Sequence, residues 1–256
     1  MVQSKLIFDF GMHVGQDSAQ YLKAGYQVVA IEANPDMVEK AKVKFSKQLE
    51  NSQLTILNLG VGAENGLMTF YKNLHVSEWS SFDFKIGARD NTPYQELKVE
   101  CVTADKIFSE YEKPYYVKID IEGFDHYVLS ALDPNKLPQY ISCEDSSTES
   151  IDLLFEKGYR KFKLINQARN FEAFSLSKEN NKLLNYFQLK YNRLNMRLQK
   201  FIPLKNPYSS SGPFGEDTPG PWHDYETVKG FYQSFYKGEE RIPLNNLSWF
   251  DIHASL

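Results

Sequence analysis

The sequence predicts an α/β protein built on a doubly wound, mostly parallel sheet. Two observations carry this prediction. Short apolar runs alternate with amphipathic segments over the first two-thirds of the chain, and acidic residues or glycines follow directly after the apolar runs. The length of 256 residues, with 42% hydrophobic and 24% charged residues, is typical of one globular domain with a small appendage.

The first part of the chain follows a β-α-β-α-β order. Three apolar runs predict strands, at residues 6–10, 27–31 and 54–59. A helix is expected over residues 16–24, and a second helix is expected to begin at Asn34-Pro35, because Asn caps helices and Pro suits the first helical position. Strands joined in this way by helices form a parallel sheet with right-handed crossovers.

The middle of the chain predicts antiparallel strands inserted into this pattern. Residues 67–71 and 97–102 alternate apolar and polar side chains, and a polar loop over residues 73–95 separates them. The α/β alternation then resumes. Strands are expected at 115–119 and 140–143, helices at 105–111, 124–132 and 148–157, and a closing hairpin at 160–165 with 171–176.

The last third of the chain has a different character. Residues 179–201 predict one helix, and residues 207–221 hold seven prolines and glycines, which excludes regular structure there. Residues 1–177 carry a net charge of −6, whereas residues 178–256 carry +2. We therefore expect a domain over 1–177 and a C-terminal helical and loop extension over 178–256, which forms an ordered cover on the ligand side.

Acidic residues that could bind a ligand lie where the predicted strands end. An open parallel sheet binds ligands beyond the carboxyl ends of its strands, close to the switch point of the strand order. The acids at these positions are Asp9, Glu32, Asp120, Glu144 and Asp145. An acid at the end of the second strand accepts hydrogen bonds from ribose hydroxyls, so Glu32 indicates a nucleoside ligand.

The loop after the first strand indicates which nucleoside. A dinucleotide fingerprint needs Gly-x-Gly, but this chain has Gly11-x-x-x-Gly15 with His13 between the glycines, which disfavours a pyrophosphate and hence a dehydrogenase. The Asp9 carboxylate repels phosphate and suits a ligand with an ammonium and a sulfonium group. The predicted cofactor-binding residues are Asp9, Gly11, His13, Gly15, Glu32, Ala33 and Asp120.

Two segments of the chain resemble the FkbM family of S-adenosylmethionine-dependent methyltransferases. They are Phe8-Asp9-Phe10-Gly11-Met12-His13-Val14-Gly15 and the more distinctive Lys118-Ile119-Asp120-Ile121-Glu122-Gly123. The resemblance covers about residues 5–165, and His13 departs from it, since the family more often has Asn there. It implies a Rossmann-like class I methyltransferase fold, S-adenosylmethionine as cofactor, and O-methylation of a hydroxyl on a saccharide, glycoconjugate or related natural product.

Methyl transfer to an alcohol needs a base, because the hydroxyl proton must leave during attack. Asp120 is the first candidate, and Glu122 and Glu144 are the others. Glu122 is equally explained as an acid that stabilises the start of the next helix. Asp120, Glu144 and Asp145 together offer oxygen ligands for Mg²⁺, and the alternative is that one of these acids is the base and the others bind acceptor hydroxyls.

The acceptor side of the site is less well marked. Ser80, Trp222 and His223 are the predicted acceptor-binding residues, with a surface loop and core packing as the alternatives. Lys190, Arg193, Arg197 and Lys200 form a basic face on the predicted helix. This face is either exposed to solvent or binds an anionic partner. An RNA methyltransferase is the second interpretation, although the net charge of −4 opposes nucleic-acid binding, and a non-catalytic nucleoside-binding module is the third.

The composition also bears on where the protein works. No stretch approaches the roughly 18 apolar residues of a membrane span, and the first residues lack the pattern of a secretion signal. Two cysteines, Cys101 and Cys143, lie in apolar runs and are expected to be reduced core residues. We therefore predict a cytoplasmic enzyme with a small-molecule or glycan acceptor, and the sequence does not indicate its oligomeric state.

Overall fold

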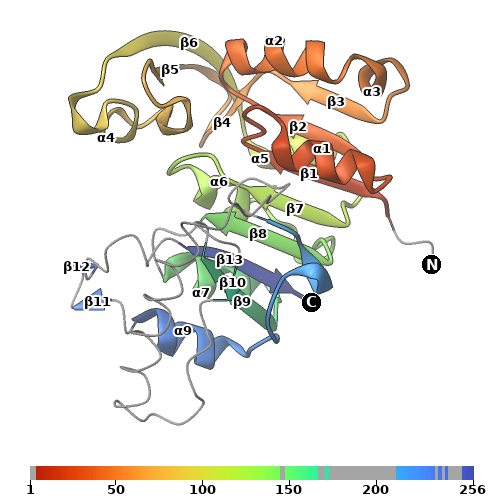
Figure 1. The fold of residues 1–256 in the computed structure, drawn as a ribbon. Helices are drawn as coiled ribbons and strands as arrows, with labels where there is room; N and C mark the ends of the chain where they lie inside the picture. Colours follow the sequence, from red (N-terminus) through yellow and green to blue (C-terminus); the bar gives the residue numbers. More distant parts are fainter. Residues whose placement is uncertain are drawn as a thin grey trace, which may run out of the picture.

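The structure is a computed structural model that describes residues 4–144, 148–166, 171–172, 212–233, 236–237, 240–241 and 250–256. Its centre is an eight-stranded sheet of order β10-β9-β13-β8-β7-β1-β2-β3 (Figure 1). The strands are β1 (Leu6–Phe10), β2 (Gln27–Ile31), β3 (Leu54–Leu57), β7 (Tyr116–Ile119), β8 (Tyr140–Glu144), β9 (Lys161–Asn166), β10 (Phe171–Glu172) and β13 (Phe250–Ser255). The doubly wound, mostly parallel sheet predicted from the sequence is confirmed.

Strands β1, β2, β3, β7 and β8 pair in parallel, and helices pack on both faces of this part of the sheet. One face packs against α1 (Gln16–Lys23), α2 (Pro35–Lys44) and α3 (Ser46–Glu50). The other packs against α5 (Ala104–Ser109), α6 (Asp125–Ser130) and α7 (Glu149–Lys157). Residues 6–10 and 116–119 are buried throughout, as expected for strands that are covered on both faces.

The last strand of the chain lies inside the sheet. β13 pairs antiparallel with β8 on one side and with β9 on the other. The predicted C-terminal extension includes residues 250–255, and for these residues the prediction is wrong. The β9–β10 hairpin is confirmed as antiparallel, with residues 171–172 as its described second strand.

A separate three-stranded sheet is inserted between β3 and β7. It consists of β4 (Gly60–Val61), β5 (Gly66–Asn73) and β6 (Tyr94–Val102), with β5 and β6 antiparallel. The segment between β5 and β6 carries the short helices η1 (Ser77–Trp79), α4 (Phe84–Gly87) and η2 (Arg89–Asn91). The predicted antiparallel insertion is therefore confirmed, and the polar loop of the prediction contains three short helices.

The described part of the extension packs near the amino ends of β7 and β8. The Phe214 ring stacks on Tyr116 with a centroid distance of 4.1 Å, and Trp222 stacks on Tyr140 at 6.1 Å. Tyr116 and Tyr140 are the first residues of their strands. The extension also contains η3 (Gly215–Asp217), α9 (Tyr225–Gln233), β11 (Tyr236–Lys237) and β12 (Glu240–Arg241). The predicted helix over 179–201, with its basic face, lies outside the described residues.

Both cysteines are buried and form no disulfide with each other, as predicted. Among the described residues, we find no helix with the length and apolar character required to cross a bilayer.

Candidate active site

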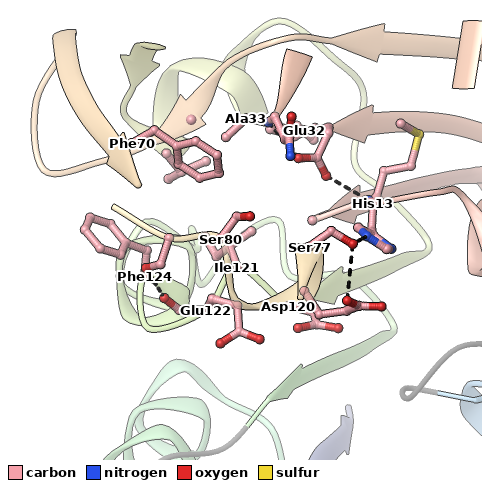
Figure 2. Close-up of a pocket in the computed structure, with 18 of the residues that line it drawn as sticks. His13, Glu32, Ala33, Phe70, Ser77, Ser80, Asp120, Ile121, Glu122 and Phe124 are labelled. Atoms are coloured by element: carbon pink, nitrogen blue, oxygen red, sulfur yellow. Dashed lines mark hydrogen bonds between the residues drawn. The ribbon is translucent and has the colours of Figure 1, made fainter. Parts of the chain in front are cut away.

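A pocket of about 480 Å³ lies between the carboxyl ends of β1, β2 and β7 and the inserted sheet. Its walls come from the loop after β1, from residues 31–34 and 59–61, from residues 77–82 of the insertion and from the turn after β7. Figure 2 shows Glu32 and Ala33 on one side of this space and Asp120 and Glu122 on the other. The pocket therefore lies at the edge of the sheet where the sequence placed its acids.

The two glycines of the first loop are required by its geometry. Gly11 has a φ of +82°, and a Cβ atom there would lie 1.8 Å from the carbonyl oxygen of Asp120. Gly15 has a φ of +67°, and a Cβ atom there would lie 2.5 Å from the Phe45 ring. Gly11 lines the pocket, whereas Gly15 lies outside its walls and shapes the turn into α1.

Glu32 follows β2 and faces the pocket with only 8% of its surface exposed. Its Oε2 accepts a hydrogen bond from the His13 amide nitrogen, and its Oε1 accepts one from the Asn34 amide nitrogen, both at 2.7 Å. Burial raises the pKa of Glu32 to about 6, against the effect of these two amide donors. Each carboxylate oxygen keeps a further lone pair for a ligand hydroxyl.

His13 connects the first loop to the insertion. Its Nε2 lies 2.8 Å from Ser77 Oγ in η1, and its backbone φ is +52°. Burial lowers the pKa of His13, so the ring is neutral at physiological pH. The imidazole thus lies in the pocket wall and holds η1 against the loop after β1, residues 11–15, which we call the cofactor loop after its role in the sequence prediction (Figure 2).

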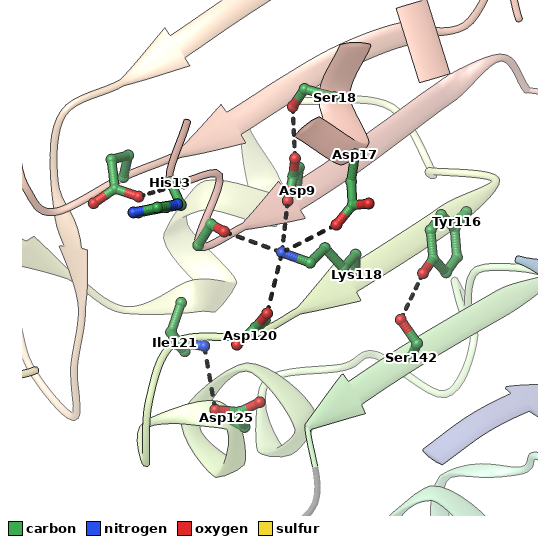
Figure 3. A network of polar contacts seen from close by, with 12 residues as sticks. Asp9, His13, Asp17, Ser18, Tyr116, Lys118, Asp120, Ile121, Asp125 and Ser142 are labelled. Atoms are coloured by element: carbon green, nitrogen blue, oxygen red, sulfur yellow. Dashed lines mark hydrogen bonds and ion pairs between the residues drawn. The ribbon is translucent and has the colours of Figure 1, made fainter. Parts of the chain in front are cut away.

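Lys118 lines the pocket, and its local sequence pattern had not been assigned a role. It sits in β7 with 2% of its surface exposed, and its Nζ contacts oxygen atoms on four residues (Figure 3). It donates to the Gly11 carbonyl at 3.0 Å and lies 3.2 Å from Asp9, 3.6 Å from Asp120 and 3.9 Å from Asp17. Burial alone lowers the pKa of Lys118, but the surrounding carboxylates outweigh burial and raise the pKa above its ordinary value.

Asp9 belongs to this network and lies behind the pocket wall. The side chain is fully buried, accepts a hydrogen bond from Ser18 Oγ at 2.5 Å and does not line the pocket. Asp9 therefore contacts Lys118 behind the pocket wall, and its predicted contact with the cofactor stays a prediction. The signal in the sequence was the lysine itself, because a charged residue within the apolar run 115–119 needs buried partners.

Three acids lie close together beside the pocket. One carboxylate oxygen from each of Asp120, Glu122 and Glu144 lies within 4.8 Å of the others, while Asp145 lies outside the described residues. Glu122 accepts a hydrogen bond from Arg89 Nη2 at 2.8 Å. Burial and the nearby Asp120 carboxylate raise the pKa of Glu122 to about 7, although Arg89 lowers it. Arg89, from the insertion, was also missed, because nothing in its local sequence marks it.

The structure separates the predicted acceptor residues. Ser80 lines the pocket, but Trp222 and His223 do not. Trp222 Nε1 donates to Glu216, and the His223 backbone pairs with Phe162 of β9. The assignment of these two residues to the pocket is thus corrected, because their segment packs near the amino ends of the strands. The aromatic side chains that do line the pocket are Phe70, Trp79, Phe82 and Phe124.

Comparison with solved structures finds methyltransferases at low sequence identity. An FkbM methyltransferase from Methylobacillus flagellatus KT is 16% identical over 63% of this chain and 40% of its own, with a TM-score of 0.45. The phosphoethanolamine N-methyltransferase 2 of Haemonchus contortus, in complex with S-adenosyl-L-methionine, is 12% identical over 100% of this chain and 49% of its own, with a TM-score of 0.38. The chain thus spans less than half the length of either protein.

Comparison with curated protein sequences gives no significant match. The family model of the methyltransferase FkbM domain matches residues 9–161, which is more than half of the chain and contains both segments on which the resemblance rests. The chain therefore belongs to the FkbM family of S-adenosylmethionine-dependent methyltransferases.

Proposed function

We propose that this enzyme transfers a methyl group to a hydroxyl of a saccharide, glycoconjugate or related natural product. One observation carries the proposal. A single pocket combines a buried acid suited to ribose, Glu32, with two further carboxylates, Asp120 and Glu122, and with walls of aromatic side chains. The first acid serves the cofactor, and the other two serve an acceptor that loses a proton.

The residues present fit S-adenosylmethionine. Glu32 has lone pairs free for the two ribose hydroxyls, and Ala33 lies beside it in the wall. The loop from Gly11 to His13 forms the adjoining wall, and the glycine lets this loop pass close to the Asp120 carbonyl oxygen. We place the amino-acid part of the cofactor beside this loop. When bound, S-adenosylmethionine supplies an electrophilic methyl group on a positively charged sulfur, which the carboxylate of Asp120 suits.

Glu122 is the acid best placed to act as base. A base works best when its pKa lies near the working pH, and the pKa of Glu122 lies at about 7. Asp120 Oδ2 lies 3.6 Å from the Lys118 ammonium group, and its carboxylate accepts a hydrogen bond from the acceptor. The different surroundings of the two acids separate their roles, as in other sites with two carboxylates.

The charge of the pocket bears on the acceptor class. Its walls carry the carboxylates of Glu32, Glu78, Asp120 and Glu122 against the single lysine Lys118. Such a site repels phosphates, which disfavours RNA and anionic glycans. Carboxylates that accept hydrogen bonds from hydroxyls, next to apolar rings, suit a neutral saccharide.

The donor set does not favour Mg²⁺. Two of the three clustered acids already have a cationic partner, since Lys118 Nζ lies 3.6 Å from Asp120 and Arg89 lies 2.8 Å from Glu122. We therefore assign no step to a metal ion. The role of an acceptor-side cover remains a prediction for residues 178–211, which lie outside the described residues.

The test is an acceptor screen with S-adenosylmethionine labelled in the methyl group. The panel contains neutral saccharides, amino sugars, uronic acids, sugar phosphates and RNA, each with and without EDTA. We expect transfer to a neutral saccharide hydroxyl that is insensitive to EDTA and lost in Glu122→Gln. Transfer to RNA or to sugar phosphates contradicts the acceptor class, and loss of transfer with EDTA contradicts the metal-free assignment.

A further inference from the structure

One ammonium group lies between the cofactor loop and the acceptor side of the site. Lys118 Nζ donates to the Gly11 carbonyl at 3.0 Å and lies 3.6 Å from Asp120 Oδ2, and both of these partners line the pocket. Gly11 follows β1, whereas Asp120 follows β7. The lysine therefore fixes the position of the loop relative to the acid, in addition to the pairing of the two strands.

The partners behind the lysine hold it in this place. Asp9 and Asp17, at 3.2 and 3.9 Å from Nζ, are both at least 98% buried. Three carboxylates and the Gly11 carbonyl surround one ammonium group, so the lysine stays charged and is held by four partners. A buried charge with fixed partners is a rigid support for the two groups that it contacts on the pocket side.

A second buried lysine provides a contrast. Lys163 lies on β9 with 1% of its surface exposed, in the same row across the sheet, through Ser142 of β8 and His253 of β13. Its Nζ donates to the Thr218 carbonyl at 2.6 Å, in the extension. Lys163 does not line the pocket and lies three strands from Lys118, which is about 14 Å.

We propose that Lys118 is a positioning residue that sets the cofactor loop and the Asp120 carboxylate in the arrangement that binds S-adenosylmethionine. The inference rests on the proposed function, because it takes the pocket as the cofactor site. It assigns to the lysine no contact with the acceptor and no part in proton transfer. The ammonium group acts through Gly11 and Asp120.

The test compares cofactor binding by calorimetry in the full chain. Lys118→Met removes the charge, and Asp9→Asn/Lys118→Met also removes one carboxylate, so that the double variant keeps the net charge of the network and the contact of residue 9 with Ser18. Asp9→Asn alone is the background for the double variant, and Lys163→Met is the control. We expect S-adenosylmethionine to bind at least tenfold more weakly to both Lys118 variants than to wild type, and within threefold of wild type to Lys163→Met.

Melting curves separate positioning from folding. We expect the double variant to melt closer to wild type than Lys118→Met does, while its cofactor affinity stays low. Wild-type affinity in a folded Lys118 variant overturns the inference, and so does an equal loss in Lys163→Met. If wild type itself does not bind S-adenosylmethionine, the proposed function fails instead.

A measurement on the wild-type protein covers the case in which neither Lys118 variant folds. In protein labelled with ¹⁵N at the lysine side chains, Lys163→Met identifies the ammonium signal of Lys163, and Asp9→Asn identifies that of Lys118 by shifting it. Addition of S-adenosylmethionine is expected to shift the Lys118 signal and to leave the Lys163 signal in place. An unmoved Lys118 signal at saturating cofactor overturns the inference.

Discussion

Replacement of Glu32 by glutamine tests the cofactor side of the pocket. Both carboxylate oxygens accept a hydrogen bond from a backbone amide, of His13 and of Asn34. A glutamine amide offers one oxygen only, so its NH₂ group faces one of these N–H donors. Glu32→Gln thus removes the charge, disturbs the start of the loop and weakens the acceptor for the ribose hydroxyls.

The magnitude follows from these contacts. A hydrogen bond to a charged group contributes about 1.5–3 kcal/mol, so we expect S-adenosylmethionine to bind roughly 10- to 150-fold more weakly. The backbone N–H group that loses its acceptor, of His13 or Asn34, is expected to lower the free energy of unfolding by about 1–3 kcal/mol. Calorimetric titration and chemical denaturation measure the two effects separately. Glu64→Gln, at an exposed glutamate in the turn before β5, is the matched control.

The pH dependence gives a second readout of the same residue. The pKa of Glu32 is raised to about 6, above that of an unfolded chain, so its stabilising contribution is present at acid pH and is lost as the pH rises through 6. The affinity for the cofactor depends on pH in the opposite direction, because ribose hydroxyls bind more strongly to the ionised carboxylate than to the protonated one. We expect wild-type affinity to fall as the pH drops below 6 and this dependence to vanish in Glu32→Gln. A variant that keeps wild-type affinity and pH dependence refutes the ribose assignment.

Three further substitutions follow from the geometry. Gly11→Ala places a Cβ atom 1.8 Å from the Asp120 carbonyl oxygen at a φ of +82°, so we expect a loss of about 2–5 kcal/mol in unfolding experiments; an unchanged melting temperature contradicts the close approach. Trp222→Ala is expected to leave the Kd for S-adenosylmethionine unchanged, since Trp222 lies outside the pocket, and a tenfold change by calorimetry would place it back there. Asp125 is buried with a pKa raised to about 7 by burial and by Asp120, and its Oδ1 has no hydrogen-bond partner in the described part of the chain. Because the raised pKa makes the ionised form costly, Asp125→Asn is expected to stabilise the protein by about 1–3 kcal/mol at pH 8 and not at pH 4, and equal stability at both values contradicts this account.

Local patterns predicted most of the elements correctly. Residues 6–10 and 27–31 form β1 and β2 with the predicted bounds, because short apolar runs close to glycines favour buried strands. The glycines at 11 and 15 and the acid at 32 could be predicted from their spacing alone. The two glycines adopt the positive φ values of the turn, and Glu32 follows the strand end directly. The alternation of apolar and polar residues also identified β5 and β6 as antiparallel strands.

The features that the sequence analysis missed depend on contacts between distant segments. β13 pairs with β8 and β9 although about 85 residues separate it from β9, and no local pattern predicts that register. Lys118 and Arg89 acquire their partners only when β1, α1 and the insertion come together. Trp222 was assigned to the site because it lies in a segment rich in prolines and aromatic residues, which does not determine the end of the sheet at which it packs.

The most direct test of the account is a crystal structure with S-adenosylhomocysteine, the product that the cofactor leaves behind. We expect the ribose hydroxyls on the Glu32 carboxylate, the amino-acid part beside Gly11 and the sulfur facing Asp120. A nucleoside bound elsewhere, or a ribose without contact to Glu32, contradicts this expectation.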